Sequence, residues 1–124
     1  VTAVSYRSLL KAFYPMKEAA LVERYADENG LDEALVYAVM KTESDFDAEA
    51  VSAAKAKGLM QLTLPTFQWL QSKTGETLEG DALFDKEVNV RYGTLFLRLL
   101  KEEFGTTQEI LAAYHAGRGM VTAG

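Results

Sequence analysis

Apolar side chains recur at intervals of three and four residues along most of the 124-residue chain, as they do on the buried face of an amphipathic helix. No segment alternates apolar and polar residues over the length of a strand, and runs of β-branched residues are missing. The pattern predicts an all-α fold. The expected helices cover residues 6–13, 15–29, 32–44, 65–75, 85–104 and 106–116, with boundaries that are approximate.

Residues with helix-ending or helix-starting chemistry stand between these segments. Gly30 follows the second segment, where a left-handed residue commonly ends a helix. Asp32 and Asp85 are expected N-caps, and Thr106 and Glu109 have the spacing of a capping box. Residues 45–57 and 80–84 are expected to be loops, and residues 58–62 a short helical turn.

Glu43 falls on the apolar face of its predicted helix. It follows Val36, Val39 and Met40 at spacings of seven, four and three residues, so the face that buries them carries the carboxyl group toward the core. Burial of a carboxyl group disfavours its charged form, which suits a general acid that works near neutral pH. A second interpretation stays open, in which Glu43 ends its helix and turns to solvent.

Length and composition exclude several classes of protein. The chain suits one compact domain, and its net charge of -5 without a basic stripe argues against nucleic-acid binding. No apolar stretch is long enough to span a bilayer. With no cysteine and one histidine, neither a disulfide nor a metal site is expected, and no cofactor is predicted.

Five short motifs occur in an order that resembles the soluble lytic transglycosylase family, which is related in fold to goose-type lysozyme. The resemblance runs from about Tyr14 onward and implies a lysozyme-like helical domain with a substrate groove. Residues 1–124 are accordingly expected to be a single catalytic domain, a fragment of a larger protein cut shortly after the last motif. The motifs are Glu43-Ser44, Val51-Ser52, Gly58-Leu59-Met60-Gln61, Asn89 to Gly93, and Ala113-Tyr114-His115-Ala116-Gly117.

The resemblance implies a reaction with one catalytic carboxyl group, that of Glu43. It protonates the glycosidic oxygen that leaves N-acetylmuramic acid, and as a carboxylate it then removes the proton of the C6 hydroxyl, which closes a 1,6-anhydro ring. The substrate's own N-acetyl group stabilises the cationic centre, so no second protein carboxylate is required. Asp45 and Asp47 are therefore interpreted as loop residues, with shaping of the cleft as the alternative.

The same resemblance implies substrate-binding roles for several polar and apolar side chains. Each has an ordinary structural alternative: a turn for Ser52, core packing for Met60, a solvated helix face for Gln61, close helix packing at Gly93 beside Asn89, and a core position with a polar tip for Tyr114. The implied substrate-binding set is Ser52, Met60, Gln61, Asn89, Tyr114 and His115.

His115 departs from the family, which usually has asparagine at this position. We expect a neutral residue in the groove or supporting it, and an imidazole there introduces a new pH dependence. His115→Asn is expected to leave turnover largely intact.

The implied partner is the glycan strand of peptidoglycan. The domain is expected to be monomeric and to lie in the cell envelope, on the periplasmic or extracellular side. Two alternatives remain. One is a goose-type muramidase that hydrolyses the same bond. The other is a non-catalytic peptidoglycan-binding module, although such a module has no need of a carboxyl group on an apolar helix face.

Overall fold

The computed structural model describes residues 18–120 of the chain, with side chains for residues 18–116. Outside the helices of this part, the chain forms turns, loops and two isolated bridges, which confirms the all-α prediction. The expected helix over residues 6–13 and the expected start at Pro15 lie outside the described residues. The elements are α2 (Ala19–Glu28), α3 (Glu33–Ser44), α4 (Leu64–Thr74), η2 (Gly80–Phe84), α5 (Lys86–Glu103) and α6 (Thr107–Met120).

The predicted capping residues act as expected. The Asp32 carboxylate accepts the Ala34 amide at 2.9 Å at the start of α3, and Asp85 accepts the amides of Glu87 and Val88 at the start of α5. These bonds satisfy amides that lack a partner within the first turn of a helix. One half of the predicted capping box forms ahead of α6, where the Thr106 hydroxyl accepts the Glu109 amide at 3.1 Å; the Glu109 carboxylate accepts from the Thr106 hydroxyl and not from its amide.

Three segments differ from their predicted form. Residues 80–84, predicted as a loop, form the 3-10 helix η2, because the Ala82 and Asp85 amides bond to carbonyls three residues earlier. The predicted end of α6 before Gly117 is wrong, because the helix continues to Met120. A glycine within a helix costs only about 1 kcal/mol and need not stop it.

The third difference concerns residues 58–62, where a helical turn was predicted. Gly58 and Gln61 have positive φ angles of 83° and 53°, which a right-handed helical turn does not allow. The segment is instead a tight loop, closed by backbone hydrogen bonds in both directions between Lys57 and Leu62.

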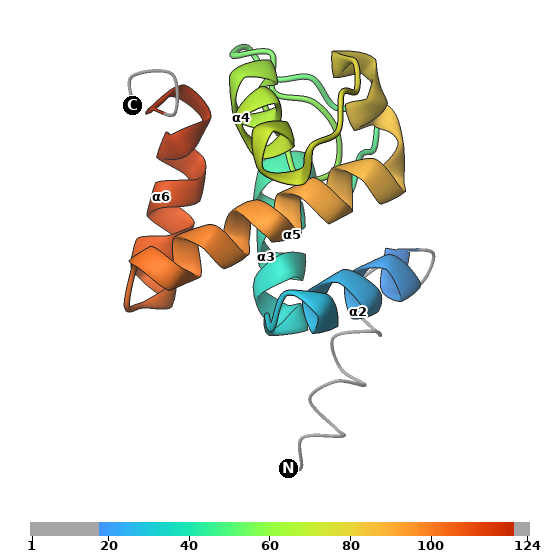
Figure 1. Cartoon of the computed structure of the whole chain (residues 1–124). Coiled ribbons are helices and arrows are strands. Elements are labelled where there is room, and N and C mark those ends of the chain that lie inside the picture. The colour runs from blue at the N-terminus through green and yellow to red at the C-terminus, as the bar shows by residue number, and fades with distance from the viewer. Residues whose placement is uncertain (1–17, 121–124) are drawn as a thin grey trace.

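Helix α5 forms the centre of the fold (Figure 1). It contacts α2, α4, α6 and η2, and in the figure it runs between α4 with its neighbouring loops and the α2 end of the molecule. The hydrophobic core is built on these contacts, and α3 contributes one face to it. Its largest fully buried side chains include Tyr37, Met40, Leu59, Met60, Phe67, Leu70, Tyr92, Phe96, Leu97 and Tyr114.

No helix within the described residues is long and apolar enough to cross a membrane.

Candidate active site

Glu43 lies in the last turn of α3, and its side chain is only 6% exposed. The residue as a whole is partly exposed, so solvent reaches its backbone more than its carboxyl group. The interpretation that Glu43 turns to solvent is therefore wrong, and the burial expected from helical periodicity is confirmed. Its Oε2 lies 3.2 Å from Nδ1 of His115 on α6, a side chain that is 67% exposed.

The neighbouring Ser44 fastens this end of α3 to the loop over residues 58–62. Its hydroxyl lies 2.6 Å from the Leu59 carbonyl oxygen and 3.1 Å from the Met40 carbonyl oxygen of its own helix. The first contact joins two segments that are 15 residues apart in the sequence. Asp45 then ends the helix in the left-handed conformation, with φ of 51°. The carboxyl group of Glu43 is thus held at a helix end that is fixed from outside the helix.

Asn89 holds the same loop from the side of α5. Its buried amide oxygen accepts the Met60 amide at 2.7 Å, and its amide nitrogen donates to the carbonyls of Lys57 and Leu83, both at 2.9 Å. Gly58 makes this approach possible, because a Cβ there would overlap with the Asn89 side chain and the Leu83 carbonyl. Asn89 is therefore a structural clamp on the loop, and a contact between its amide and a sugar stays a prediction.

Met60 and Gln61 point into the protein. Met60 is fully buried against Gly93, where an added Cβ would lie 2.8 Å from the Met60 Cβ and 2.9 Å from its Cε. The close approach expected at Gly93 is confirmed. Gln61 is 1% exposed and donates from Nε2 to the carbonyls of Ala50 and Gly58, so its interpretation as a solvated side chain is wrong. Substrate contact by either side chain stays a prediction, which this burial does not favour.

Tyr114 is a buried anchor between α6 and the loop. Its hydroxyl donates to the Met60 carbonyl at 2.6 Å, and its ring centroid lies 5.0 Å from that of Phe96 on α5. The core position with a polar tip is confirmed. Because His115 directly follows Tyr114, this anchor also fixes where the imidazole reaches Glu43.

Ser52 organises the turn before the Gly58 loop. Its hydroxyl accepts the Ala56 amide at 3.1 Å, and its own amide donates to the Ala56 carbonyl at 3.0 Å. The turn interpretation of Ser52 is confirmed, and its implied role in substrate binding stays a prediction.

The family model described as the Transglycosylase SLT domain matches residues 20–123. The chain belongs to this family.

Curated relatives and a solved structure agree with this assignment. The SLT domain is 34% identical over 112 residues to "Membrane-bound lytic murein transglycosylase C" of Edwardsiella ictaluri, which covers 82% of this chain and 31% of that protein. The protein of the same name from Serratia proteamaculans is 34% identical over 118 residues, 85% of this chain and 32% of its own length. The chain thus spans about a third of the length of these relatives.

The solved structure is that of an inactive glutamate-to-glutamine variant of the lytic transglycosylase Slt from Pseudomonas aeruginosa. It matches with a TM-score of 0.77 and 32% identity, over 88% of this chain and 18% of that chain. The lysozyme-like fold class expected from the motifs is confirmed.

The two aspartates that follow Glu43 in this SLT domain are engaged in local contacts. Asp45 pairs with Lys41 on its own helix, and the Asp47 carboxylate accepts the Glu49 amide at 2.9 Å. Both Asp45 and Asp47 are exposed. Their interpretation as loop residues is confirmed, and Glu43 is the buried carboxyl group at this end of α3.

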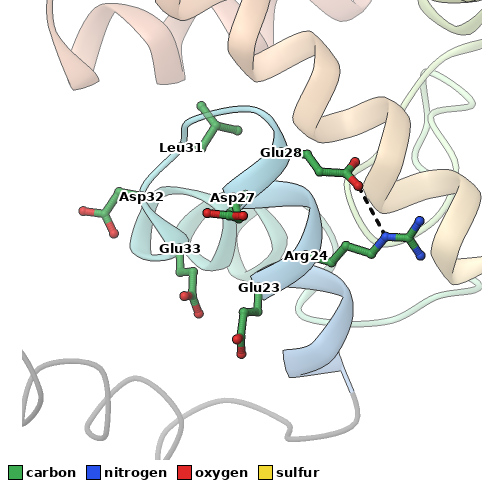
Figure 2. A pocket seen from close by; sticks show the side chains of 8 residues that line it. Glu23, Arg24, Asp27, Glu28, Leu31, Asp32 and Glu33 are labelled. Atoms are coloured by element: carbon green, nitrogen blue, oxygen red, sulfur yellow. Dashed lines mark hydrogen bonds and ion pairs between the residues drawn. The ribbon is translucent and has the colours of Figure 1, made fainter.

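A hollow of about 660 Å³ lies elsewhere, where α2 passes into α3 (Figure 2). Exposed acidic side chains line much of it, including Glu23, Asp27 and Asp32. Figure 2 shows them spread around the turn, with Arg24 paired to Glu28 rather than to a central group. No cluster of three or more His, Cys, Asp or Glu side chains that could hold a metal forms among the described residues. The paired Glu43 and His115 are a better candidate for chemistry than this solvated rim.

The sequence did not reveal two contacts that define the site. Glu43 and His115 are 72 residues apart, and their meeting depends on how α6 packs on α4 and α5. The link from Ser44 to Leu59 was also missed, although both residues belong to recognised motifs. The available signal was that each residue belongs to one of the motifs, because the motifs that build one site come together in the fold.

Proposed function

We propose that this SLT domain cleaves the β-1,4 bond between N-acetylmuramic acid and N-acetylglucosamine in peptidoglycan and leaves a 1,6-anhydro end. One observation carries the proposal: the Glu43 side chain is 6% exposed yet lies 3.2 Å from an imidazole that is 67% exposed. A carboxyl group in this position is shielded from water and still lies near the surface, where a polymer can reach it. The first step requires a carboxyl group that can pass a proton to the glycosidic oxygen.

In the first step Glu43 acts as a general acid. Its proton passes to the glycosidic oxygen while the bond between that oxygen and C1 of N-acetylmuramic acid breaks. The departing N-acetylglucosamine keeps the proton as a hydroxyl group, and positive charge develops at C1. The acetamido group of the substrate stabilises that charge, so the reaction belongs to the substrate-assisted exceptions to the two-carboxylate scheme.

In the second step the Glu43 carboxylate acts as a general base. It takes the proton of the C6 hydroxyl while the C6 oxygen bonds to C1. The carboxyl group regains its proton, and no water is consumed. The local engagement of Asp45 and Asp47 supports a scheme with one catalytic carboxyl group.

The predicted substrate-binding residues divide by exposure. His115 is exposed beside Glu43, and Ser52 is half-buried, so we propose direct contact with the glycan for these two side chains. Met60, Asn89 and Tyr114 are buried, and their hydrogen bonds support a role in holding the Gly58 loop against α3. Gln61 has the same holding role through its two bonds to loop carbonyls.

We further propose that the domain works as a monomer on glycan strands in the cell envelope, on the periplasmic or extracellular side. The names of the curated relatives, which are membrane-bound lytic murein transglycosylases, support this location. Residues 1–124 are proposed to be one catalytic domain of a larger protein.

Digestion of purified peptidoglycan sacculi in water enriched in oxygen-18 tests the reaction. Ring closure by the C6 hydroxyl predicts fragments that are lighter by one water molecule than hydrolysis products and carry no heavy oxygen at the new end. Hydrolysis by a muramidase mechanism would place one heavy oxygen at C1. Binding of sacculi with no soluble fragments would identify a non-catalytic module and overturn the proposal.

A further inference from the structure

The contact between His115 and Glu43 joins two groups that both exchange protons. Nδ1 of the imidazole lies 3.2 Å from Oε2 of the carboxyl group. The two groups come from different helices, and the carboxyl group is shielded while the ring is exposed to solvent. An imidazole commonly changes charge between about pH 5 and 8.

Two proton-binding groups at this distance do not titrate independently. A proton on Nδ1 stabilises the carboxylate form of Glu43, because the imidazolium then donates a hydrogen bond to an opposite charge. With the imidazole neutral, a protonated Glu43 can donate to Nδ1 instead. Since the first catalytic step needs the proton on Glu43, a proton on His115 works against it.

Several charged side chains on the neighbouring elements have partners other than Glu43 and His115. On α3 and the loop after it, Lys41 pairs with Asp45 and the Asp47 carboxylate binds a backbone amide. The Tyr114 hydroxyl donates to a carbonyl. On α4 and α5, Lys73 lies over the Trp69 ring, Arg91 pairs with Glu76, and Lys101 donates to the Gly30 carbonyl.

We propose that His115 is a positioning residue that ties the protonation of Glu43 to its own, so that the domain is slowed when the imidazole is charged. The inference rests on the proposed role of Glu43 as the acid. The neutral ring holds Oε2 in place, and the charged ring retains Glu43 as a carboxylate. Asparagine at this position would offer a hydrogen bond near the place of Nδ1 without a proton that titrates.

The contact is tested by nuclear magnetic resonance without any need for activity. His115 is the one histidine of the chain, so an untagged protein has a single imidazole signal to follow against pH. Glu43→Gln is expected to move that titration to lower pH, because the imidazolium loses its carboxylate partner. The matched change Glu49→Gln, at an exposed loop position, should leave the curve in place. Coinciding curves for the wild type and Glu43→Gln would overturn the proposal.

The consequence for turnover is tested by the pH profile of His115→Asn. A partly exposed ion pair is worth about 0.2–1 kcal/mol, so the ratio of the His115→Asn rate to the wild-type rate should be up to about fivefold higher between about pH 5.5 and 6.5 than at pH 8, where an imidazole is ordinarily neutral. A change in direct glycan contact at position 115 affects the rate at every pH, so the test compares this ratio between pH values and not the absolute rates. A purely structural role would change the rate by the same factor at every pH, and parallel profiles would overturn the proposal.

A second variant tests whether the effect requires the contact between His115 and Glu43 or only a histidine on α6. The double change His115→Asn with Ala116→His keeps one imidazole on α6 but turns it to a different side of the helix, since consecutive residues do not face the same way. Its profile should follow that of His115→Asn, and a return to the wild-type profile would contradict the inference. Full activity of Glu43→Gln would contradict the proposed function but not the coupling. The magnetic resonance titration decides separately whether the two groups are coupled.

Discussion

Asn89 was expected to contact substrate, but its side chain supports the site by holding the backbone of the Gly58 loop. Both ends of its amide bond to the backbone around the Gly58 loop, and the side chain is fully buried. The loop carries the Leu59 carbonyl to which Ser44 is bound, next to Glu43. The position of the acid therefore depends on an asparagine in another helix.

Removal of this amide should destabilise the whole domain. Asn89→Ala leaves an amide and two carbonyls without their partner in the interior, and we expect a loss of about 3 kcal/mol or more in the free energy of unfolding. Urea unfolding followed by circular dichroism measures this loss. Gln68→Ala, which removes an exposed amide from α4, should stay within about 0.5 kcal/mol of the wild type. A loss below 1 kcal/mol for Asn89→Ala would contradict the clamp.

At the scale of residues, the sequence predicted the burial of the Glu43 side chain but not its contact with His115. Helical periodicity placed Glu43 on the buried face, because position within a helix is a local property. It did not predict that His115 meets Glu43, because that contact needs the tertiary packing of α6. Resemblance selected Met60, Gln61 and Asn89 as important without distinguishing a sugar contact from a support.

At the scale of elements, the connection from α4 to η2 is fastened to α5 through one carboxylate. Glu76 accepts hydrogen bonds from the Tyr92 hydroxyl and, at 2.7 Å, from the Arg91 guanidinium. The Tyr92 bond first, and the Arg91 bond next, lower the pKa of Glu76 from its ordinary value of 4.5. The folded state thus favours the charged carboxylate.

This connection predicts a pH dependence of stability. A depressed pKa contributes stability that is fully present above pH 4.5 and is lost as the pH falls through the lower value of the folded protein. The difference in unfolding free energy between the wild type and Glu76→Gln should therefore be largest near neutrality and shrink below pH 4.5. Thermal unfolding from pH 7 to pH 3 measures it, with the exposed Glu79→Gln as control. A difference that stays constant over that range would argue against the network.

Helix starts were predictable because their signals are local. Asp32, Asp85 and Thr106 cap the helices at which the sequence placed them. The 3-10 helix η2 and the extension of α6 to Met120 were not predicted, because a few hydrogen bonds of short range decide them. The left-handed Gln61 also has no signal in its residue type, since its conformation is imposed by the bonds that close the loop.

At the scale of the whole molecule, the site forms where the end of α3, the Gly58 loop and α6 meet. Three contacts join them, from Ser44 to Leu59, from Tyr114 to Met60 and from Glu43 to His115. Each crosses between motifs that are well separated in the sequence. The all-α class followed from periodicity alone, whereas the lysozyme-like fold required the order of the motifs, and the site required in addition the packing of the helices.

The central claim is that one carboxyl group performs both proton transfers, and a pair of matched variants tests it most directly. The rate of release of soluble fragments from purified sacculi is measured for Glu43→Gln and for Glu49→Gln, with folding checked by circular dichroism. The account predicts a loss of about 10²- to 10⁴-fold for Glu43→Gln and an unchanged rate for Glu49→Gln. A folded Glu43→Gln protein that releases fragments at the wild-type rate would contradict it.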